Sequence, residues 1–270
     1  MSLASFSGLG HYGELGNQMF QIAAVYGYAR KYGKTPIFPE WTCKISGRNY
    51  TDIFKYPIDQ TLYSRIVSHA DFRRYNYMDL TYIEIPDTSY NLDFVGYFQS
   101  EKYFLNCEDE IRKIFTPQDE IVEYIQNKYK EVLSVKNKVS LQVRTGGRSV
   151  NDYDVHKYAT KDFLEKCQNH FTDTELFVVF ADNMELAKQL LPEGNNYFLV
   201  ENEENYIDLF FMNMFDSFIV SPSTFGWWGA WLSQNKNAKV VIMKDWFAAG
   251  KSKEYLNINN DQVPERWIKI

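Results

Sequence analysis

The chain of 270 residues lacks the usual marks of a secreted or membrane-spanning protein. Its three cysteines, Cys43, Cys107 and Cys167, are far apart, odd in number and without the spacing of a zinc site, so we expect free thiols in a reducing compartment. No apolar run reaches the length of a membrane span, and no basic region followed by an apolar signal segment opens the chain. These absences predict a cytoplasmic protein and leave peripheral association with a membrane open.

Positive charge is also scarce. With 29 Lys and Arg against 35 Asp and Glu, the formal net charge is -6, which provides no overall field to attract nucleic acid. No internal repeat is visible, so the order of the elements carries the prediction of the fold. Aromatic residues are abundant instead, with 20 Tyr, 20 Phe and 6 Trp, a composition that suits ring-lined clefts or an aromatic core. The oligomeric state stays open.

The first 136 residues predict one lobe of an α/β protein. A helix follows a Gly-rich turn, with Asn17 as its expected cap and Gly33 as its end. A second, amphipathic helix is expected after Thr116, and the segment that ends it, at residues 134–138, is the expected lobe boundary. Strands are expected at Leu3–Phe6, Thr35–Phe38, Tyr82–Ile85 and Phe94–Tyr97.

Residues 137–270 predict a second lobe in which strands and helices alternate. The apolar runs are typical of strands buried on both faces, so we expect a parallel, doubly wound sheet. The expected strands are Val139–Val143, Glu175–Ala181, Tyr197–Val200, Phe218–Val220 and Lys239–Met243. The expected helices are Lys161–Asn169, Met184–Leu190, Tyr206–Phe215 and Phe225–Leu232.

Ligands bind beyond the carboxyl ends of the strands in such sheets, and Arg144 directly follows the first strand of this lobe. An arginine there can pair with a diphosphate, and the glycines at 146 and 147 let the backbone approach it. Arg148 can add a second positive charge. The alternative is a surface arginine beside a flexible turn.

Two further strand ends carry polar groups. Asp182 can accept a hydrogen bond from a nucleotide, or it can cap the helix that starts at Met184. Ser223 and Thr224, with Phe225, open a helix whose free amides form an anion site. The tryptophans at 228 and 231 can also serve as packing alone.

Two short motifs compete with this interpretation. Gly8, Gly10 and Gly13 form GxGxxG, the pattern of a dinucleotide site, but Glu40 lies further along than the usual distance of about 20 residues. Asp152 and Asp154 form a DxD pair, which can hold a divalent metal or simply lie in a loop.

Taken together, ELGNQMFQ at 14–21, the Arg144 segment, FAD at 180–182 and STFGWWGAWL at 223–232 resemble the α-1,2-fucosyltransferase family. The resemblance implies two Rossmann-like lobes of the GT-B type and inverting transfer of fucose from GDP-fucose, without metal or other cofactor, to a galactoside 2-hydroxyl. It implies a nucleotide-sugar donor and a glycan acceptor as partners. By this resemblance Arg144 holds the diphosphate and Asp182 faces the nucleotide. The remaining donor-binding residues that it implies are Gly16, Asn17, Gln18, Ser223, Thr224 and Phe225.

The chain departs from the family pattern His-x-Arg-Arg-Gly-Asp-Tyr at three positions, where Gln142, Thr145 and Gly147 replace the His, the second Arg and the Asp. The alternative for the third position is an insertion that moves Asp152 and Tyr153 into the place of the Asp-Tyr pair. Transfer also needs a group that accepts the proton of the acceptor hydroxyl. Asp152, Asp154, His156 and Glu14 are the candidates.

Three other functions remain as alternatives. The lost parts of the arginine motif are compatible with a non-catalytic protein that binds a nucleotide sugar or glycan, and with a transferase for a different nucleotide sugar. A literal reading of GxGxxG gives an NAD-dependent enzyme that modifies sugars.

Overall fold

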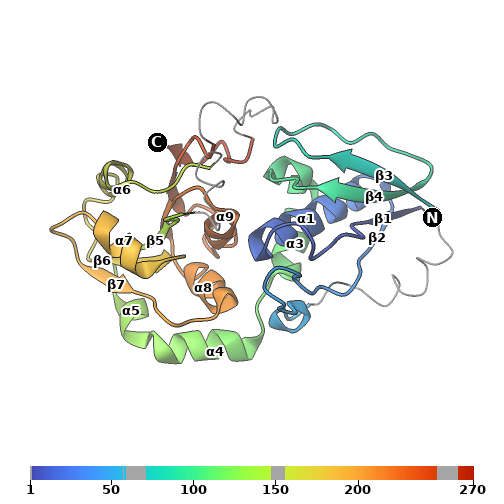
Figure 1. Ribbon diagram of the computed structural model, residues 1–270. Coiled ribbons are helices and arrows are strands. Elements are labelled where there is room, and N and C mark those ends of the chain that lie inside the picture. The colour runs from blue at the N-terminus through green and yellow to red at the C-terminus, as the bar shows by residue number, and fades with distance from the viewer. Residues whose placement is uncertain (1, 57, 59–70, 147–155, 248–260) are drawn as a thin grey trace. The chain divides into compact units, whose positions relative to one another are not determined.

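The computed structural model describes residues 2–56, 58, 71–146, 156–247 and 261–270. Contacts divide the chain into a first unit, Met1–Gln118 with Tyr255–Pro264, and a second unit, Asp119–Glu254 with Glu265–Ile270 (Figure 1). This division falls after Gln118 and not between residues 136 and 137, where the sequence places the boundary. The reason is packing, because the ring of Tyr129 stacks on that of Phe211 at 4.2 Å within the second unit.

The first unit contains a four-stranded parallel sheet in the order β2-β1-β4-β3. Its strands are β1 (Leu3–Ser5), β2 (Thr35–Ile37), β3 (Phe72–Tyr77) and β4 (Asn91–Gly96). Its helices are α1 (Leu15–Tyr32), α3 (Glu108–Ile114) and the short 3-10 turns η1 (Thr51–Ile53), η2 (Glu101–Tyr103) and η3 (Leu105–Cys107).

The prediction of a strand at Tyr82–Ile85 is wrong. The edge strand of this sheet is Phe72–Tyr77 instead. All six residues of Phe72–Tyr77 pair in register with β4. The backbone N–H groups of the 82–85 segment bond to side chains, Tyr82 to Asp261 at 2.9 Å and Ile83 to the Tyr103 hydroxyl at 3.3 Å. These bonds replace a strand ladder.

Helix α1 begins at Leu15, two residues before the expected cap. Glu14 occupies the cap position without a side-chain cap bond, so the prediction of Asn17 as cap is wrong. The Asn17 Oδ1 instead accepts a hydrogen bond of 2.6 Å from Gln99 Nε2. Gly33 ends the helix as predicted, in the left-handed conformation with φ 63.

The second unit contains a six-stranded parallel sheet in the order β10-β9-β8-β5-β6-β7, which confirms the predicted doubly wound lobe. Its strands are β5 (Lys138–Val143), β6 (Leu176–Ala181), β7 (Tyr197–Leu199), β8 (Ser217–Val220), β9 (Lys239–Ile242) and β10 (Ile268–Lys269). Its helices are α4 (Asp119–Lys128), α5 (Lys130–Ser134), α6 (Lys161–Gln168), α7 (Met184–Leu190), α8 (Asn205–Met212) and α9 (Thr224–Trp231).

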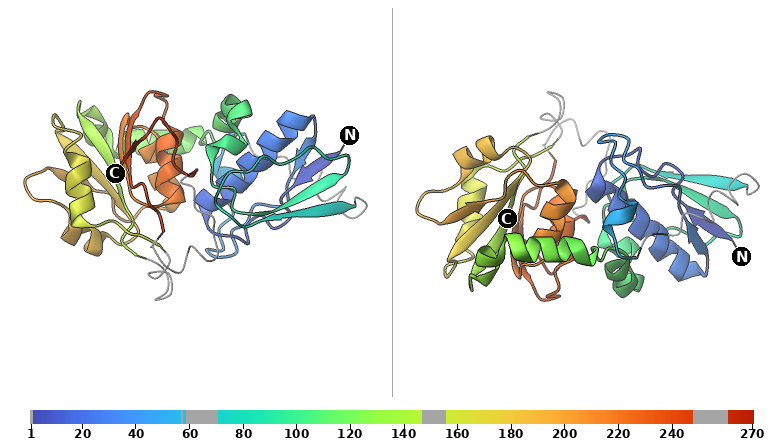
Figure 2. Two further views of the ribbon diagram at one scale, coloured as in Figure 1. Left: turned by 90° about the horizontal axis from the view of Figure 1, so that it is seen from above. Right: turned by 90° about the horizontal axis from the view of Figure 1, so that it is seen from below.

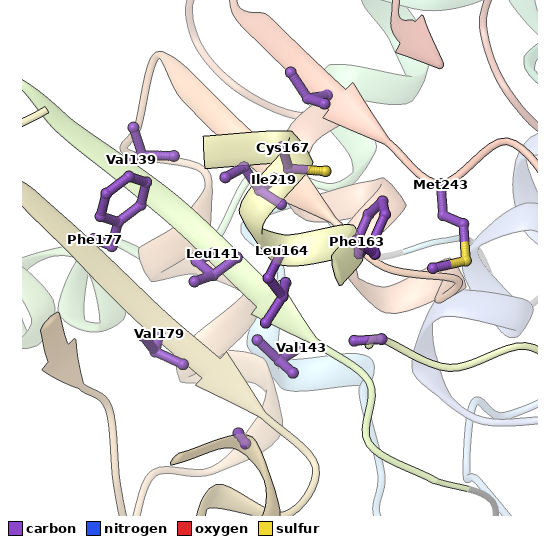
Figure 3. Packing of buried hydrophobic residues seen from close by; sticks show 13 residues of the cluster. Val139, Leu141, Val143, Phe163, Leu164, Cys167, Phe177, Val179, Ile219 and Met243 are labelled. Atoms are coloured by element: carbon purple, nitrogen blue, oxygen red, sulfur yellow. The ribbon is translucent and has the colours of Figure 1, made fainter. Parts of the chain in front are cut away.

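Helices cover both faces of this second sheet, with α6 and α7 on one side and α8 and α9 on the other (Figure 2). Alternate side chains of β5 therefore meet different helices. Leu141 and Val143 belong to the apolar cluster that includes Leu164 of α6 (Figure 3). Gln142 points the opposite way, toward Gly226 of α9. This alternation brings a polar side chain into the layer between β5 and α9.

The described helices include none that combines the length and the apolar character needed to cross a bilayer.

Replacing Gly27 in the middle of α1 with alanine tests the packing of the first unit. Glycine to alanine in a helix interior normally stabilises by about 1 kcal/mol. Here the added Cβ would lie 1.9 Å from the Tyr103 carbonyl oxygen. We therefore expect Gly27→Ala to lower the free energy of unfolding by more than about 2 kcal/mol instead of raising it. Urea denaturation measures this free energy of unfolding.

Gly229→Ala in α9 is the matched control, because the three atoms nearest to its Cβ would all belong to the side chain of Met212 and none to the backbone. We expect an effect below about 1 kcal/mol there. A Gly27→Ala chain as stable as the unaltered one would contradict the close approach of α1 to η2.

Candidate functional site

Three neighbouring strands of the second unit end at the same edge of the sheet. The register pairs Gln142 with Val220 and Val143 with Ala181, so β8, β5 and β6 end level with one another. The residues that follow are Ser221, Arg144 and Asp182. Parallel pairing therefore brings together residues that are separated by up to 77 positions in the chain.

Asp182 bonds to the residues after β5 and does not cap the next helix. Its Oδ1 accepts hydrogen bonds from the Thr145 N–H at 2.8 Å and the Thr145 hydroxyl at 2.9 Å, and its Oδ2 lies 3.3 Å from Arg144 Nη1. Asn183 caps α7 through a bond of 3.1 Å from the Leu186 N–H. The interpretation of Asp182 as the helix cap is wrong, because the cap lies one residue later.

Arg144 is held at its backbone and at its side chain. Its N–H donates to the Ser221 hydroxyl at 2.6 Å, and its carbonyl accepts from the Ala159 N–H at 2.9 Å. The guanidinium pairs with Asp182, yet the side chain remains 31% exposed. A guanidinium has five N–H donors, so this one can also bind an oxyanion at the edge of the sheet.

The start of α9 forms the third part of the edge. Ser223 caps the helix, its hydroxyl accepting from the Gly226 N–H at 3.4 Å. Ser223, Thr224 and Phe225 are half-buried and so remain accessible to a ligand. The tryptophans at 227, 228 and 231 are fully buried and pack on one another, which confirms a packing role for them. The helix dipole favours an anion at this end.

Gln142 is 95% buried beside this helix start, since its relative exposure is 5%. Its Oε1 accepts a hydrogen bond of 2.9 Å from the Ser221 hydroxyl. A Cβ on Gly226 would lie 2.7 Å from the same oxygen, so only glycine lets α9 approach so closely. Ser221 itself was not among the residues predicted from the sequence, because nothing local distinguishes it from other serines that follow a strand.

The sequence-predicted residues of the first unit lie where the loop after β1 meets α1. Gln18 is fully buried, donating to the Gly13 carbonyl at 2.8 Å and accepting from Trp41 Nε1 at 2.7 Å. Gly16 is buried too, whereas Asn17 and Glu14 are half-buried. Gln18 thus fixes the loop from within, and Asn17 is the more accessible amide of the pair.

The Gly-rich loop before α1 is held by packing. Gly10 has φ 90, and a Cβ there would lie 2.1 Å from the Thr42 carbonyl oxygen. Gly13 has φ 71 and lies against the Asn17 side chain. Both glycines are explained by backbone conformation and close contacts inside the first unit.

The candidates for a general base are only partly described. Asp152, Asp154 and Arg148 lie outside the described residues, and so does Gly147. His156 is exposed, with its ring 5.1 Å from that of Phe247. Among the residues whose positions are given, no group of three or more His, Cys, Asp or Glu side chains is arranged to hold a metal ion.

Sequence reasoning missed Asp208, which lies in the first turn of α8. Its Oδ1 is buried and finds no hydrogen-bond partner among the described residues. Burial, together with the negative charge of Glu203, raises the pKa of the Asp208 carboxyl to about 7. The signal in the sequence is a carboxylate among Ile207, Leu209 and Phe210, on a helix whose only other strongly polar residue is Asn205.

Comparison with known proteins identifies relatives along nearly the whole chain. The model of glycosyl transferase family 11 matches residues 8–270. The α-1,2-colitosyltransferase of Escherichia coli is 27% identical over 190 residues, covering 67% of this chain and 63% of that protein. The galactoside 2-α-L-fucosyltransferase of Caenorhabditis elegans is 27% identical over 280 residues, covering 95% and 76%. A second Escherichia coli relative, the O-antigen biosynthesis glycosyltransferase WbnK, is 28% identical over 186 residues. The chain spans less than two thirds of the length of each Escherichia coli relative, 63% of the first and 59% of WbnK.

Solved structures share the fold at low sequence identity. The fucosyltransferase NodZ from Bradyrhizobium superposes with a TM-score of 0.58 at 13% identity, covering 86% of this chain and 92% of that one. POFUT1 in complex with GDP-fucose superposes with a TM-score of 0.53 at 13% identity, covering 89% and 97%. These similarities confirm the predicted α/β fold with parallel sheets, of the GT-B type.

Replacing Asp208 with asparagine tests whether its carboxyl is buried as described. The folded pKa of about 7 exceeds the value of about 3.9 in an unfolded chain, so the folded state binds the proton more tightly. The penalty for the charged form is absent below about pH 4, grows as the pH rises and is complete above about pH 7. We expect Asp208→Asn to be more stable than the unaltered chain at pH 8, by about 1.4 kcal/mol or more, and equal at pH 4.

Free energies of unfolding in urea at several pH values measure this difference. Asp162→Asn is the control, because that carboxylate is 73% exposed on α6 and should leave the pH dependence unchanged. A stability difference between Asp208→Asn and the unaltered chain that does not vary with pH would show that Asp208 is ionised without penalty.

Proposed function

The chain belongs to glycosyl transferase family 11, and from this premise we propose that it transfers fucose from GDP-fucose to a glycan hydroxyl. The proposed acceptor group is the 2-hydroxyl of a galactoside, the reaction inverts the configuration of the sugar, and no metal ion takes part. The observation that supports the proposal is that Arg144, which pairs with Asp182, lies at the same sheet edge as the accessible start of α9. The name of the Caenorhabditis elegans relative supports the acceptor and the linkage.

The chemistry of transfer requires positive charge near the diphosphate, where the bond to the sugar breaks. As the bond between the sugar and the diphosphate lengthens, the sugar becomes oxocarbenium-like and negative charge grows on the diphosphate. The Arg144 guanidinium supplies a charged donor for that oxygen cluster. The amides at the start of α9 supply neutral donors and the positive end of a helix dipole. Together they would take the part that a divalent cation plays in other transferases, which supports a metal-independent reaction.

Asp208 is the group that we propose as the hydrogen-bond acceptor for the nucleobase. It lies in the first turn of the helix that leaves β7, toward the same edge of the sheet as Arg144. Its Oδ1 is buried without a hydrogen-bond partner among the residues described here, whereas the residue as a whole is half-buried, so a base would contact the accessible part of the carboxyl group. Guanine presents N–H donors that a carboxyl oxygen can accept, and adenine lacks an equivalent pair. An acceptor at this position therefore favours a guanine nucleotide.

The base that removes the acceptor proton stays among the four candidates, Asp152, Asp154, His156 and Glu14. His156 is the exposed one of the two candidates that the structure describes, and an imidazole nitrogen is a common general base.

A second candidate is transfer of a related sugar from the same site. The relative from Escherichia coli that is named α-1,2-colitosyltransferase favours this alternative, as do the replacements by Gln142 and Thr145. In this case the nucleotide contacts would be unchanged and the pocket around the sugar would differ.

Calorimetric titration with GDP and GDP-fucose, in buffer with and without EDTA, tests the donor site. We expect both ligands to bind and EDTA to have no effect. Arg144→Ala should weaken binding about 10- to 100-fold, because a charged hydrogen bond to the diphosphate contributes about 1.5–3 kcal/mol. Lys188→Ala, which removes a cation from the surface of α7, should bind like the unaltered chain.

The outcome separates the alternatives. Loss of binding in EDTA would contradict the metal-independent mechanism. Equal affinity of Arg144→Ala and the unaltered chain would remove Arg144 from the donor site. Absence of binding to either guanine ligand would contradict the proposed donor.

Mass spectrometry of products tests the reaction itself. The chain is incubated with a galactoside and either GDP-fucose or nucleotide-activated colitose, and we expect a fucosylated galactoside modified at the 2-hydroxyl. Transfer of colitose alone would support the second candidate. Binding of GDP-fucose without any transfer from either donor would identify a non-catalytic binding protein.

A further inference from the structure

A chain of two hydrogen bonds connects the side chain of Gln142 to the backbone of Arg144. The Arg144 N–H donates to the Ser221 hydroxyl at 2.6 Å, and that hydroxyl donates to Gln142 Oε1 at 2.9 Å. The Ser221 N–H in turn donates to the Gln142 carbonyl at 3.2 Å. Ser221 therefore bonds to both residues on either side of Val143 and joins the ends of β5 and β8.

Both side chains in this chain of bonds are shielded from water. Ser221 has 0% relative exposure and Gln142 has 5%. Gly226 closes the site from α9, with no room for a Cβ beside the Gln142 amide. A buried hydrogen bond has no water to replace it when one partner is removed, so the geometry at Arg144 depends on both partners.

We propose that Ser221, supported by Gln142, is a positioning residue that fixes the backbone of Arg144 so that its guanidinium faces the diphosphate. The inference rests on the proposed function for its ligand. Asp182 holds the guanidinium at 3.3 Å and Ser221 holds the main chain, so the arginine is fixed at two points. Fixing a flexible side chain before the ligand arrives lowers the entropic cost of binding.

This role also explains the departure from the family pattern at position 142. A glutamine oxygen accepts a hydrogen bond from the Ser221 hydroxyl at any pH near neutral, because the amide does not titrate. Gln142 and Ser221 act on the reaction only through Arg144. Their removal should therefore weaken GDP binding less than removal of Arg144 itself.

The test combines GDP affinity with amide hydrogen exchange, both on the full chain. We expect Ser221→Ala to weaken GDP binding about threefold to tenfold, the factor that corresponds to one ordinary hydrogen bond. In the ligand-free variant the Arg144 N–H should exchange faster than in the unaltered chain. The Thr145 N–H, which donates a hydrogen bond to Asp182, should stay protected. Gln142→Met should have a smaller effect, and the double variant should weaken binding by less than the product of the two factors.

Ser233→Ala is the matched control, since it also removes a buried hydroxyl, one that donates to the Phe215 carbonyl at 2.8 Å. It should lower the melting temperature and leave GDP affinity unchanged. Unchanged Arg144 exchange in Ser221→Ala would overturn the inference, and so would a Ser233→Ala chain that loses as much GDP affinity. If exchange responds but the unaltered chain binds no GDP, the proposed function fails and with it the role of Ser221 in donor binding.

Discussion

The parallel pairing of β5 with both β8 and β6 is the constraint on which the candidate site depends. Because the strands end level, three loops meet and their first residues come within hydrogen-bond distance. The contacts of Arg144 with Ser221 and Asp182 follow directly from that register. A shift of one residue would turn Gln142 away from α9 and carry Val143 into its place, since successive side chains alternate between faces.

The same register also explains which hydrogen bonds the residues that differ from the family pattern form. Thr145 stands where the resemblance expects a second arginine, and its N–H and hydroxyl both bond to Asp182. Gln142 stands where a histidine is expected, and it accepts from Ser221. Both replacements keep a polar group that is satisfied internally, so the edge loses positive charge without gaining an unpaired buried atom.

Polar groups inside the first unit serve a related purpose. Buried Gln18 connects the glycine loop to Trp41, and Gln99 bonds to Asn17. These amides fix loops that glycine alone would leave conformationally free, because each buried donor must find an acceptor. The string that resembles the family at 14–21 is therefore explained in large part by the folding of its own unit.

The sequence by itself determined the alternating elements of the second unit, since apolar runs and helix caps are local signals. It also identified Arg144 and the helix start at Ser223 as candidates for the donor site. It also determined the family through strings at both ends of the chain. The structure decided what depends on distant partners: the edge strand Phe72–Tyr77, the pairing of Asp182 with Arg144 in place of a cap, and the role of Ser221. Asp208 was missed for the same reason, because its apolar neighbours in the chain only hint at burial, and the helices packed around it decide how far the carboxyl is buried.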